Sequence, residues 1–351
     1  MYIAEVAPSN MRGTLVSWNQ FAIIFGQLVV YFVNFLILGE HTNPIIEKTA
    51  QGVYNVVAGS DPWTIETGWR YMFGSEAVPA GLFALLICFV PETPRYLAMC
   101  GRDDKALHVL TRINGLERAK TILKEIKATA EEKTERLFTY GWMVIFIGIM
   151  LSVFQQAVGI NAVLYFAPRI FESMNMGDPM MQTVIMGIVN ILFTLVAIFT
   201  VEKWGRKPLL IYGSFGMAIG AAGVALSNLW ALPPIVSVVS IMVYSASFMF
   251  SWGPICWVLI AEIFPNTIRG AAVAIAVAFQ WIFNFIVSST FVPMYNMQLP
   301  GMDNFGHIFA YALYGIVCVI AAIFVWKLVP ETKGKTLEDM NNLWLNGTAK
   351  K

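Results

Sequence analysis

Charged side chains are scarce in this chain of 351 residues, because Asp, Glu, Lys and Arg together make up only 13% of it. A soluble globular domain contains about 25% charged residues. Histidine occurs three times and cysteine four times, with no Cys-x-x-Cys pair and no spacing typical of a metal site. A Ser/His/Asp or Cys/His set for nucleophilic catalysis is not visible either. These absences argue against a soluble domain, an enzyme, a disulfide framework and a metal centre, and we expect no cofactor.

What the sequence has instead is long apolar runs, with 57% hydrophobic residues overall. A helix that crosses a bilayer needs about 20 mostly apolar residues, because it rises about 1.5 Å per residue through a core about 30 Å thick. Continuous apolarity does not fit a β-barrel, whose strands alternate in segments of about 10 residues. The sequence therefore predicts an all-α membrane protein. Its eight predicted transmembrane helices are residues 14–38, 69–90, 140–164, 181–201, 208–229, 235–260, 270–293 and 306–329.

The distribution of basic residues predicts the orientation of these helices. If the first run enters from the cytoplasm, all but three of the 23 Lys and Arg residues lie on the cytoplasmic side. The exceptions are Lys48, Arg70 and Arg169. The opposite orientation would invert this distribution and conflict with the positive-inside rule. We therefore expect both termini in the cytoplasm.

One pattern of Glu, Pro, Arg and Gly occurs twice, as EVAPSNMRG at residues 5–13 and as EIFPNTIRG at residues 262–270. Two helices after each copy comes Pro-Glu-Thr, in PETPR at residues 91–95 and in PETKG at residues 330–334. Both copies share one orientation, as in transporters whose halves are related by an axis along the membrane normal. Four predicted helices precede the second copy within its unit, but only four residues precede the first. The repeat therefore predicts an N-terminal truncation, with eight of twelve transmembrane helices present.

The same repeat divides the chain into parts. We expect residues 1–94 to form the end of the N-terminal six-helix bundle, namely its last two helices. Residues 137–334 would form the C-terminal six-helix bundle. Residues 95–136 would be a cytoplasmic helical linker between the bundles, and residues 335–351 a cytoplasmic tail.

Two short helices are predicted within the linker. The segment DDKALHVLTRIN at residues 103–114 is amphipathic, with Asp103 as its N-cap and the following glycine as its stop signal. A second helix follows through Ile122 and Ile126. Two interpretations stay open: a solvated charged linker, or cytoplasmic helices that cover the inner mouth of a transporter.

Amides, hydroxyls and indoles are the polar groups at membrane depth, because charged residues are nearly absent from the middle of the helices. Gly159 follows two adjacent glutamines and predicts a local break that turns several amides toward one cavity. For a single Ser, Thr or Asn, hydrogen bonding between helices is the simpler interpretation. An assembly of amides with flat indoles instead fits a sugar, whose hydroxyls donate and accept and whose C–H faces stack on Trp. The amides of this assembly are Gln20, Gln155, Gln156, Asn161 and Gln280.

A second group of candidates consists of charged residues at the cytoplasmic helix ends. Paired with one another, they would latch the helix ends together while an inner gate is closed, and separate when it opens. The alternative is ordinary positive-inside topology, which explains the basic residues but not the repeated glutamates. The expected cytoplasmic gate network is Arg206, Glu262, Arg269 and Glu331, with Glu5, Arg12 and Glu92 as the contribution of the first unit.

Several of these motifs together resemble a known family. PETPR, VEKWGRKP at residues 201–208, the paired Glu-x-x-Pro-x-x-x-Arg-Gly and PETKG occur in the order typical of the sugar porter family of the major facilitator superfamily. QQAVGINAVLYFAP, SWGPICWVLIAEIFPNTIRG and VPETKGKTLEDM are especially similar to bacterial members that carry D-xylose together with protons. The resemblance covers essentially the whole chain, apart from residues 39–68 and much of residues 95–136.

The resemblance implies a role for ten residues as a substrate-binding set. In this family the sugar is held mainly by the C-terminal half, with amides and an indole on which it stacks. The amide positions correspond to Gln155, Gln156 and Asn161, the stacking position to Trp252, and later contacts to Gln280 and Trp281. Gln20 corresponds to the contact from the N-terminal half, while Tyr165, Asn190 and Gln27 correspond to positions that line the cavity.

The resemblance also implies the activity. We expect a secondary active transporter that imports a neutral monosaccharide, D-xylose, in symport with protons by alternating access. The Asp and Arg that couple the proton in such members would precede Met1. The alternatives are a facilitator or symporter for another hexose or pentose, such as glucose or arabinose, and a non-transporting truncated remnant. The expected partners are the monosaccharide, the proton and the lipid bilayer of a bacterial inner membrane. No nucleic acid is expected, and the protein would be monomeric.

Overall fold

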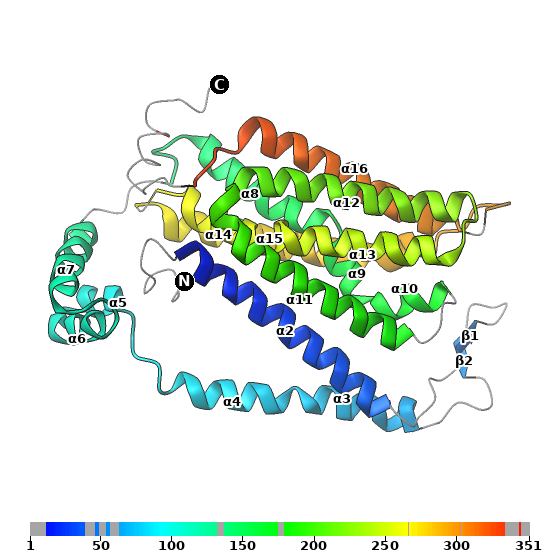
Figure 1. Ribbon diagram of the computed structural model, residues 1–351, viewed down its shortest axis with the longest axis horizontal. Helices are drawn as coiled ribbons and strands as arrows, with labels where there is room; N and C mark the ends of the chain where they lie inside the picture. The colour runs from blue at the N-terminus through cyan, green and yellow to red at the C-terminus, as the bar shows by residue number, and fades with distance from the viewer. Residues whose placement is uncertain are drawn as a thin grey trace.

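The computed structural model describes residues 12–38, 46–48, 54–56, 63–131, 137–174, 179–265, 267–302, 304–333 and 344. These residues are almost entirely helical, which confirms the predicted all-α class (Figure 1). The described residues also include a two-stranded antiparallel sheet of β1 (Ile46–Lys48) and β2 (Tyr54–Val56), in which Ile46 is opposite Val56.

The helices fall into a first group before residue 140 and a second group after it. The first group is α2 (Arg12–Leu38), the π-helical turn η1 (Thr64–Gly68), α3 (Trp69–Ser75), α4 (Ala77–Ile87), α5 (Pro94–Met99), α6 (Asp103–Asn114) and α7 (Leu116–Glu131). The second group is α8 (Trp142–Ala157), α9 (Ile160–Tyr165), α10 (Ala167–Ser173), α11 (Pro179–Trp204), α12 (Arg206–Leu229), α13 (Pro234–Phe250), α14 (Trp252–Ile263), α15 (Arg269–Tyr295) and α16 (Phe305–Leu328).

Seven segments of the described chain are long and apolar enough to cross a membrane, and they match seven of the eight predicted runs. The eighth run, residues 69–90, is divided between α3 and α4 at Glu76. Pro79 explains the division, because proline has no N–H to donate to the carbonyl of Ser75. The seven segments are Trp18–Ile37, Trp142–Tyr165, Pro179–Trp204, Arg206–Leu229, Pro234–Ile263, Arg269–Tyr295 and Phe305–Leu328.

Two of the spanning segments are broken near their middle. The break between α8 and α9 lies at Gly159, whose φ of 86° is in the left-handed region, and this confirms the break predicted there. The break between α13 and α14 lies at Ser251. Pro254 accounts for it, because its ring nitrogen cannot donate to the carbonyl of Phe250, one turn earlier. Both breaks leave backbone and amide groups inside the bundle rather than toward lipid.

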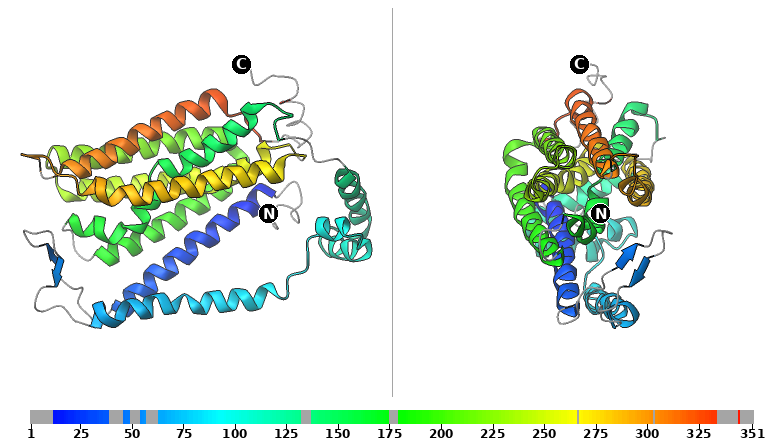
Figure 2. Two further views of the ribbon diagram at one scale, coloured as in Figure 1. Left: turned by 180° about the vertical axis from the view of Figure 1, so that it is seen from behind. Right: turned by 90° about the vertical axis from the view of Figure 1, so that its right-hand side faces the viewer.

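The core of the bundle forms where α12 packs against α13 and α16, α11 packs against α2 and α13, and α15 packs against α8 (Figures 1 and 2). Small residues allow the close approach of α12 and α13, as the glycine-rich sequence of α12 predicts. A Cβ on Gly220 would lie 2.7 Å from the backbone nitrogen of Tyr244, so only glycine fits at this crossing. In contrast, none of the described residues of α4 is buried.

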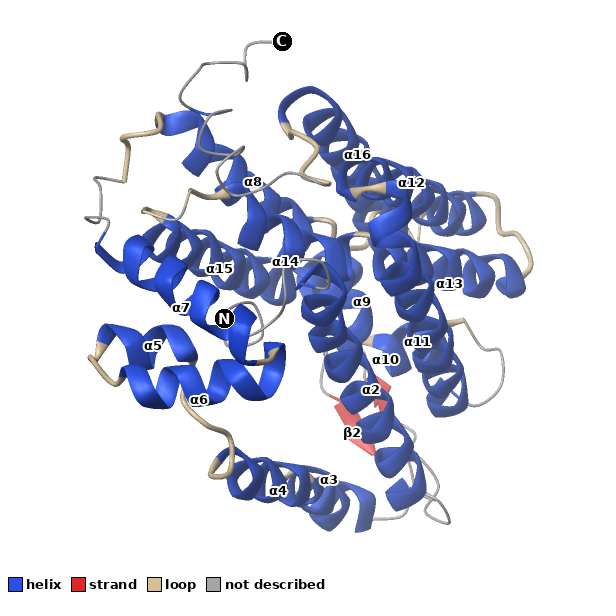
Figure 3. Ribbon diagram, turned by 60° about the vertical axis from the view of Figure 1, so that its left-hand side comes forward, coloured by secondary structure: helices blue, strands red, loops and turns tan. Residues whose placement is uncertain are grey.

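The helices α5, α6 and α7 pack on one another as a small group beside one end of the bundle (Figure 3). The predicted helix at residues 103–114 is confirmed, and Gly115, with a φ of 78°, ends it. The N-cap, however, is Arg102 and not Asp103. Asp103 is the first helical residue, and its carboxylate pairs with Lys127 of α7, which fastens the two helices together.

The bundle has two ends, the Arg206 end and the Tyr295 end. At the Arg206 end, α11 and α14 finish and α12 begins; this end is predicted to face the cytoplasm. At the opposite, Tyr295 end, α12 and α15 finish and α13 and α16 begin.

Candidate functional site

The first element of the site is a chain of hydrogen bonds through three helices. Gln280 of α15 donates its amide to the side-chain oxygen of Gln155 on α8. Gln155 in turn donates to the backbone carbonyl of Trp252, the first residue of α14, at 3.2 Å. All three residues are buried. The other amide atom of Gln280, Oε1, is buried without a hydrogen-bond partner in the described structure, which leaves an acceptor open to a ligand.

Gln156 is the centre of a second set of amide contacts. Its Oε1 accepts a hydrogen bond of 2.6 Å from Asn161 and one of 3.1 Å from Asn284. The break at Gly159 makes the first contact possible, because it allows α9 to place Asn161 beside the side chain of Gln156. Three elements, α8, α9 and α15, thus meet at one glutamine.

We call these residues the amide cluster, which consists of Gln155, Gln156, Asn161, Gln280 and Asn284. The structure therefore brings together four of the sequence-predicted binding residues and adds a fifth. The predicted binding set did not include Asn284. This residue lies four positions after Gln280 on the same helix face, and that spacing is the signal that could have identified it. The cluster is neutral, and each amide offers both donors and acceptors, as hydroxyl groups require.

Trp252, whose backbone carbonyl accepts the hydrogen bond from Gln155, is fully buried. Its indole nitrogen donates to Ser214 of α12 at 2.7 Å. Ser214 was also missed, because nothing in the sequence distinguishes it within the small-residue stripe of α12. The resemblance assigns the indole face to stacking on a sugar. In this structure the ring is buried, and the backbone carbonyl of Trp252 is the group that contacts the cluster.

The long helix α2 brings two predicted residues to the same region. Gln20 is buried, and its side-chain nitrogen lies 3.6 Å from the position that a Cβ on Gly253 would take. Gln27 donates to the hydroxyl of Tyr31 at 2.7 Å. Tyr31 donates to the carbonyl of Leu164 at 2.9 Å, which ties α2 to α9 next to the amide cluster.

In the part of the chain that the structure describes, the remaining predicted binding residues make no hydrogen bond to the amide cluster. Asn190 is buried and accepts a hydrogen bond of 2.7 Å from Ser245, which joins α11 to α13. Tyr165 and Trp281 are 55% and 65% exposed, respectively. Tyr165 follows Leu164, and Trp281 follows Gln280, so both are neighbours of contact residues along the chain.

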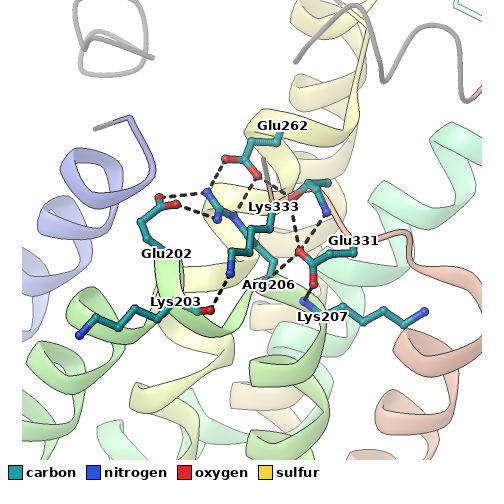
Figure 4. Close-up of polar contacts among 8 residues, drawn as sticks. Glu202, Lys203, Arg206, Lys207, Glu262, Glu331 and Lys333 are labelled. Atoms are coloured by element: carbon teal, nitrogen blue, oxygen red, sulfur yellow. Dashed lines mark hydrogen bonds and ion pairs between the residues drawn. The ribbon is translucent and has the colours of Figure 1, made fainter. Parts of the chain in front are cut away.

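Charged residues gather at the Arg206 end around one guanidinium (Figure 4). Arg206 is only 4% exposed and makes two hydrogen bonds to Glu202, both of 3.1 Å. It makes two more to Glu262 of α14, at 3.0 and 3.2 Å. A planar guanidinium suits such double contacts to carboxylates, and the pairing compensates the burial of its charge. Arg206 therefore joins the start of α12 to the ends of α11 and α14.

Glu331, just beyond α16, binds the first turn of α12. Its two carboxylate oxygens accept hydrogen bonds of 3.0 Å from the backbone N–H groups of Arg206 and Lys207. These N–H groups have no partner within the helix, and the positive end of the helix dipole favours a carboxylate there. The next residue, Thr332, donates to Glu262 at 2.7 Å. The Pro-Glu-Thr motif thus connects α16 to both α12 and α14.

Gly205 is required for this arrangement. Its φ of 90° and ψ of 170° belong to a region that only glycine occupies readily. A Cβ at this position would also lie 2.8 Å from an oxygen of Glu331. The Gly-Arg pair of the motif VEKWGRKP therefore has two functions. The glycine leaves room for the carboxylate of Glu331, and the arginine binds the carboxylates of Glu202 and Glu262.

Four further residues were predicted for the gate network, namely Arg269, Glu92, Glu5 and Arg12. Arg269 donates two hydrogen bonds, of 3.2 and 3.0 Å, to the carbonyl of Phe264, and its place in the gate network stays a prediction. These two bonds close the turn between α14 and α15. Glu92 is exposed, between α4 and α5. Glu5 and the side chain of Arg12 lie outside the described residues.

Comparison with known proteins gives concordant matches. Residues 1–344 match the family described as "Sugar (and other) transporter". The chain is 47% identical to the D-xylose-proton symporter of Escherichia coli K12, a match that covers 100% of this chain and 68% of that protein. It is 35% identical to the glucose facilitated diffusion protein of Zymomonas mobilis, over 98% of this chain and 70% of that protein. Its structure resembles that of the major facilitator superfamily proton:xylose symporter XylE bound to 6-bromo-6-deoxy-D-glucose, with a TM-score of 0.82, 48% identity, and coverage of 98% of this chain and 69% of the other.

Proposed function

Because the chain belongs to the sugar porter family of the major facilitator superfamily, we propose that it imports a neutral monosaccharide, D-xylose, in symport with protons. The observation that carries this proposal is the amide cluster. It combines several buried amides, no charged side chain and an open acceptor on Gln280. A ring of hydroxyl groups satisfies such a set, whereas an ionic substrate would leave its charge uncompensated.

The choice of sugar follows from similarity. The 47% identity with a D-xylose-proton symporter supports D-xylose as the substrate. Glucose is the second candidate, because the chain is also similar to a glucose facilitated diffusion protein. A pentose and a hexose differ by one CH₂OH group, and a pocket that merely has room for this group discriminates weakly between them.

We assign the charged network at the Arg206 end to the inner gate. Arg206, Glu202, Glu262 and Glu331 hold the ends of four helices together while the inner side is closed. Opening toward the cytoplasm separates these ends, and binding energy from sugar and proton drives the exchange. Alternating access then proceeds by rocking of two half-bundles around the site.

The arrangement in the membrane completes the proposal. Both termini face the cytoplasm, the membrane is a bacterial inner membrane, and the protein acts as a monomer. Residues 1–94 belong to the N-terminal bundle and residues 137–334 to the C-terminal bundle, with residues 95–136 as the cytoplasmic linker and residues 335–351 as the tail. This assignment follows the internal repeat.

Uptake of labelled D-xylose into cells that lack their own xylose transporters tests the proposal. We expect saturable uptake that a protonophore abolishes and that excess unlabelled xylose inhibits. Competition by excess glucose and arabinose compares the candidate sugars. Inhibition by glucose but not by xylose would overturn the choice of D-xylose. If the chain reaches the membrane but no sugar is taken up, the non-transporting alternative is favoured.

A further inference from the structure

A cavity lies at the Tyr295 end of the bundle, between α10, α12, α13, α15 and α16, and has a volume of about 240 Å³. Its floor is formed by buried side chains, among them Ser227, Ser237 and Tyr311. Its rim is formed by exposed residues, among them Asn304 and Pro234. The cavity therefore opens to the surface at this end and closes toward the interior of the bundle.

The floor of this cavity is polar, and part of it lacks a partner. Ser237 donates to Ser227 at 2.8 Å in the floor, and nearer the rim the hydroxyls of exposed Ser173 and buried Tyr295 lie 2.9 Å apart. The hydroxyl of Tyr311 is buried and makes no hydrogen bond in the described structure, although its residue is only 1% exposed. A buried hydroxyl without a partner is costly, so this position favours a ligand that supplies one.

The lining is also neutral and aromatic. No Asp, Glu, Lys or Arg is among the described residues that line the cavity. The ring of Tyr295 stacks on the imidazole of His307, with centroids 4.0 Å apart and planes inclined by 24°. Flat rings beside hydroxyl groups suit a molecule that has both C–H faces and hydroxyls, and do not suit an ion.

The cavity is separate from the amide cluster. Along α15, the fifteen positions from Gln280 to Tyr295 correspond to about 22 Å at about 1.5 Å per residue. Phe291 and Tyr314 stack on each other between the two sites, with ring centroids 6.4 Å apart. A ligand in this cavity therefore does not occupy the amide cluster.

We propose that this cavity is a second binding site for a small, neutral, polyhydroxylated molecule, a pentose or a sugar alcohol. Its volume is well above the roughly 30 Å³ of a water molecule and slightly below the about 300 Å³ at which pockets for drug-sized ligands begin. The ligand accepts a hydrogen bond from Tyr311 and contacts the serines of the floor. Because Ser173 belongs to α10 and Tyr311 to α16, the ligand bridges these two helices.

Equilibrium dialysis of the purified full chain with labelled xylitol tests this site. Tyr311→Phe removes the unpartnered hydroxyl and keeps the ring, while Ser237→Leu fills the floor. Tyr314→Phe is the matched control, because the Tyr314 hydroxyl is equally unpartnered and on the same helix but does not line the cavity. We expect saturable binding that is about fivefold weaker in Tyr311→Phe, absent in Ser237→Leu and unchanged in Tyr314→Phe.

A further variant separates this proposal from the proposed function. Gln280→Ala disrupts the amide cluster, and we expect xylitol binding at the second site to be unchanged in it although the KM for D-xylose uptake rises. Loss of xylitol binding in Gln280→Ala would place the ligand in the amide cluster and overturn the proposal. Absence of saturable binding to the unaltered protein would also overturn it. If Ser237→Leu does not fold, Tyr311→Phe decides, because unchanged binding in that variant contradicts the site.

Discussion

The guanidinium of Arg206 and the carboxylate of Glu262 lie 3.0 Å apart, although 56 positions separate them in the chain. The two partners of Arg206 differ in exposure: the side chain of Glu262 is 21% exposed and that of Glu202 is 42% exposed. Water screens the more exposed pair more strongly, so the contact with Glu262 contributes more to holding the helix ends together.

Glu262→Gln is expected to weaken the gate network more than Glu202→Gln. The change keeps the shape of the side chain but removes its charge beside a buried guanidinium, at a cost of about 2 kcal/mol. We expect a lower midpoint of thermal unfolding and slower D-xylose uptake in Glu262→Gln. Glu202→Gln is the matched control, with a smaller change in both. Equal effects of the two changes would show that the extra burial of Glu262 has no energetic consequence.

Gly205→Ala is expected to destabilise the start of α12 for two reasons. The glycine-only backbone conformation costs about 1–3 kcal/mol for alanine, and the added Cβ would lie 2.8 Å from Glu331. Gly141→Ala is the matched control, because Gly141 also precedes a spanning helix with a φ of 85° and a ψ of 159° but has open space around it. The unfolding midpoints of both variants measure the difference. If Gly141→Ala is as destabilising as Gly205→Ala, the contact with Glu331 has no role.

Local patterns in the sequence predicted much of this molecule. Seven of the eight predicted apolar runs match spanning segments, the glycine after two glutamines predicted the break at Gly159, and the amphipathic pattern predicted α6. Each depends on residues within one or two turns of a helix. The division of residues 69–90 was missed, because the effect of Pro79 was not weighed against the apolarity of the run.

Partners across helices were predictable only in part. The repeated motifs brought Arg206, Glu262 and Glu331 into one group, and the structure places them together. The same argument put Arg269 there, and this part of the network stays a prediction, while Arg269 also binds the carbonyl of Phe264. A charge pattern does not reveal which backbone oxygens an arginine also binds. The contact of Trp252 with Ser214 likewise depends on helix packing, which a single sequence does not display.

Gln280→Ala is expected to raise the KM for D-xylose about thirtyfold. The change removes the open acceptor on Gln280 and leaves Gln155 without its donor, and the loss of a neutral hydrogen bond costs about 1 kcal/mol for each. Initial rates of uptake at several sugar concentrations measure the KM. Phe285→Leu, on the exposed side of the same helix, is the control and should leave the KM unchanged. A normal KM in Gln280→Ala would remove the amide cluster from the binding site.

Gly159→Ala is expected to be strongly destabilising, and the reason extends beyond its backbone. A Cβ at this position would lie 2.6 Å from the ring of Tyr314. The positive φ costs alanine a further about 1–2 kcal/mol. Replacing the ring separates the two effects. In the double variant Gly159→Ala/Tyr314→Leu the contact with the ring is relieved, whereas the cost of the backbone conformation stays.

A double-mutant cycle on the unfolding midpoints of these variants therefore measures the steric part alone. We expect the double variant to be less destabilised than the sum of the two single variants. The reason is that the alanine methyl fills space left free when leucine replaces the larger tyrosine. The break between α8 and α9 also positions Asn161 beside Gln156. D-Xylose uptake should consequently fall in Gly159→Ala and recover partly in the double variant. Strict additivity would mean that Tyr314 does not press on Gly159, and that the backbone conformation alone makes glycine necessary there.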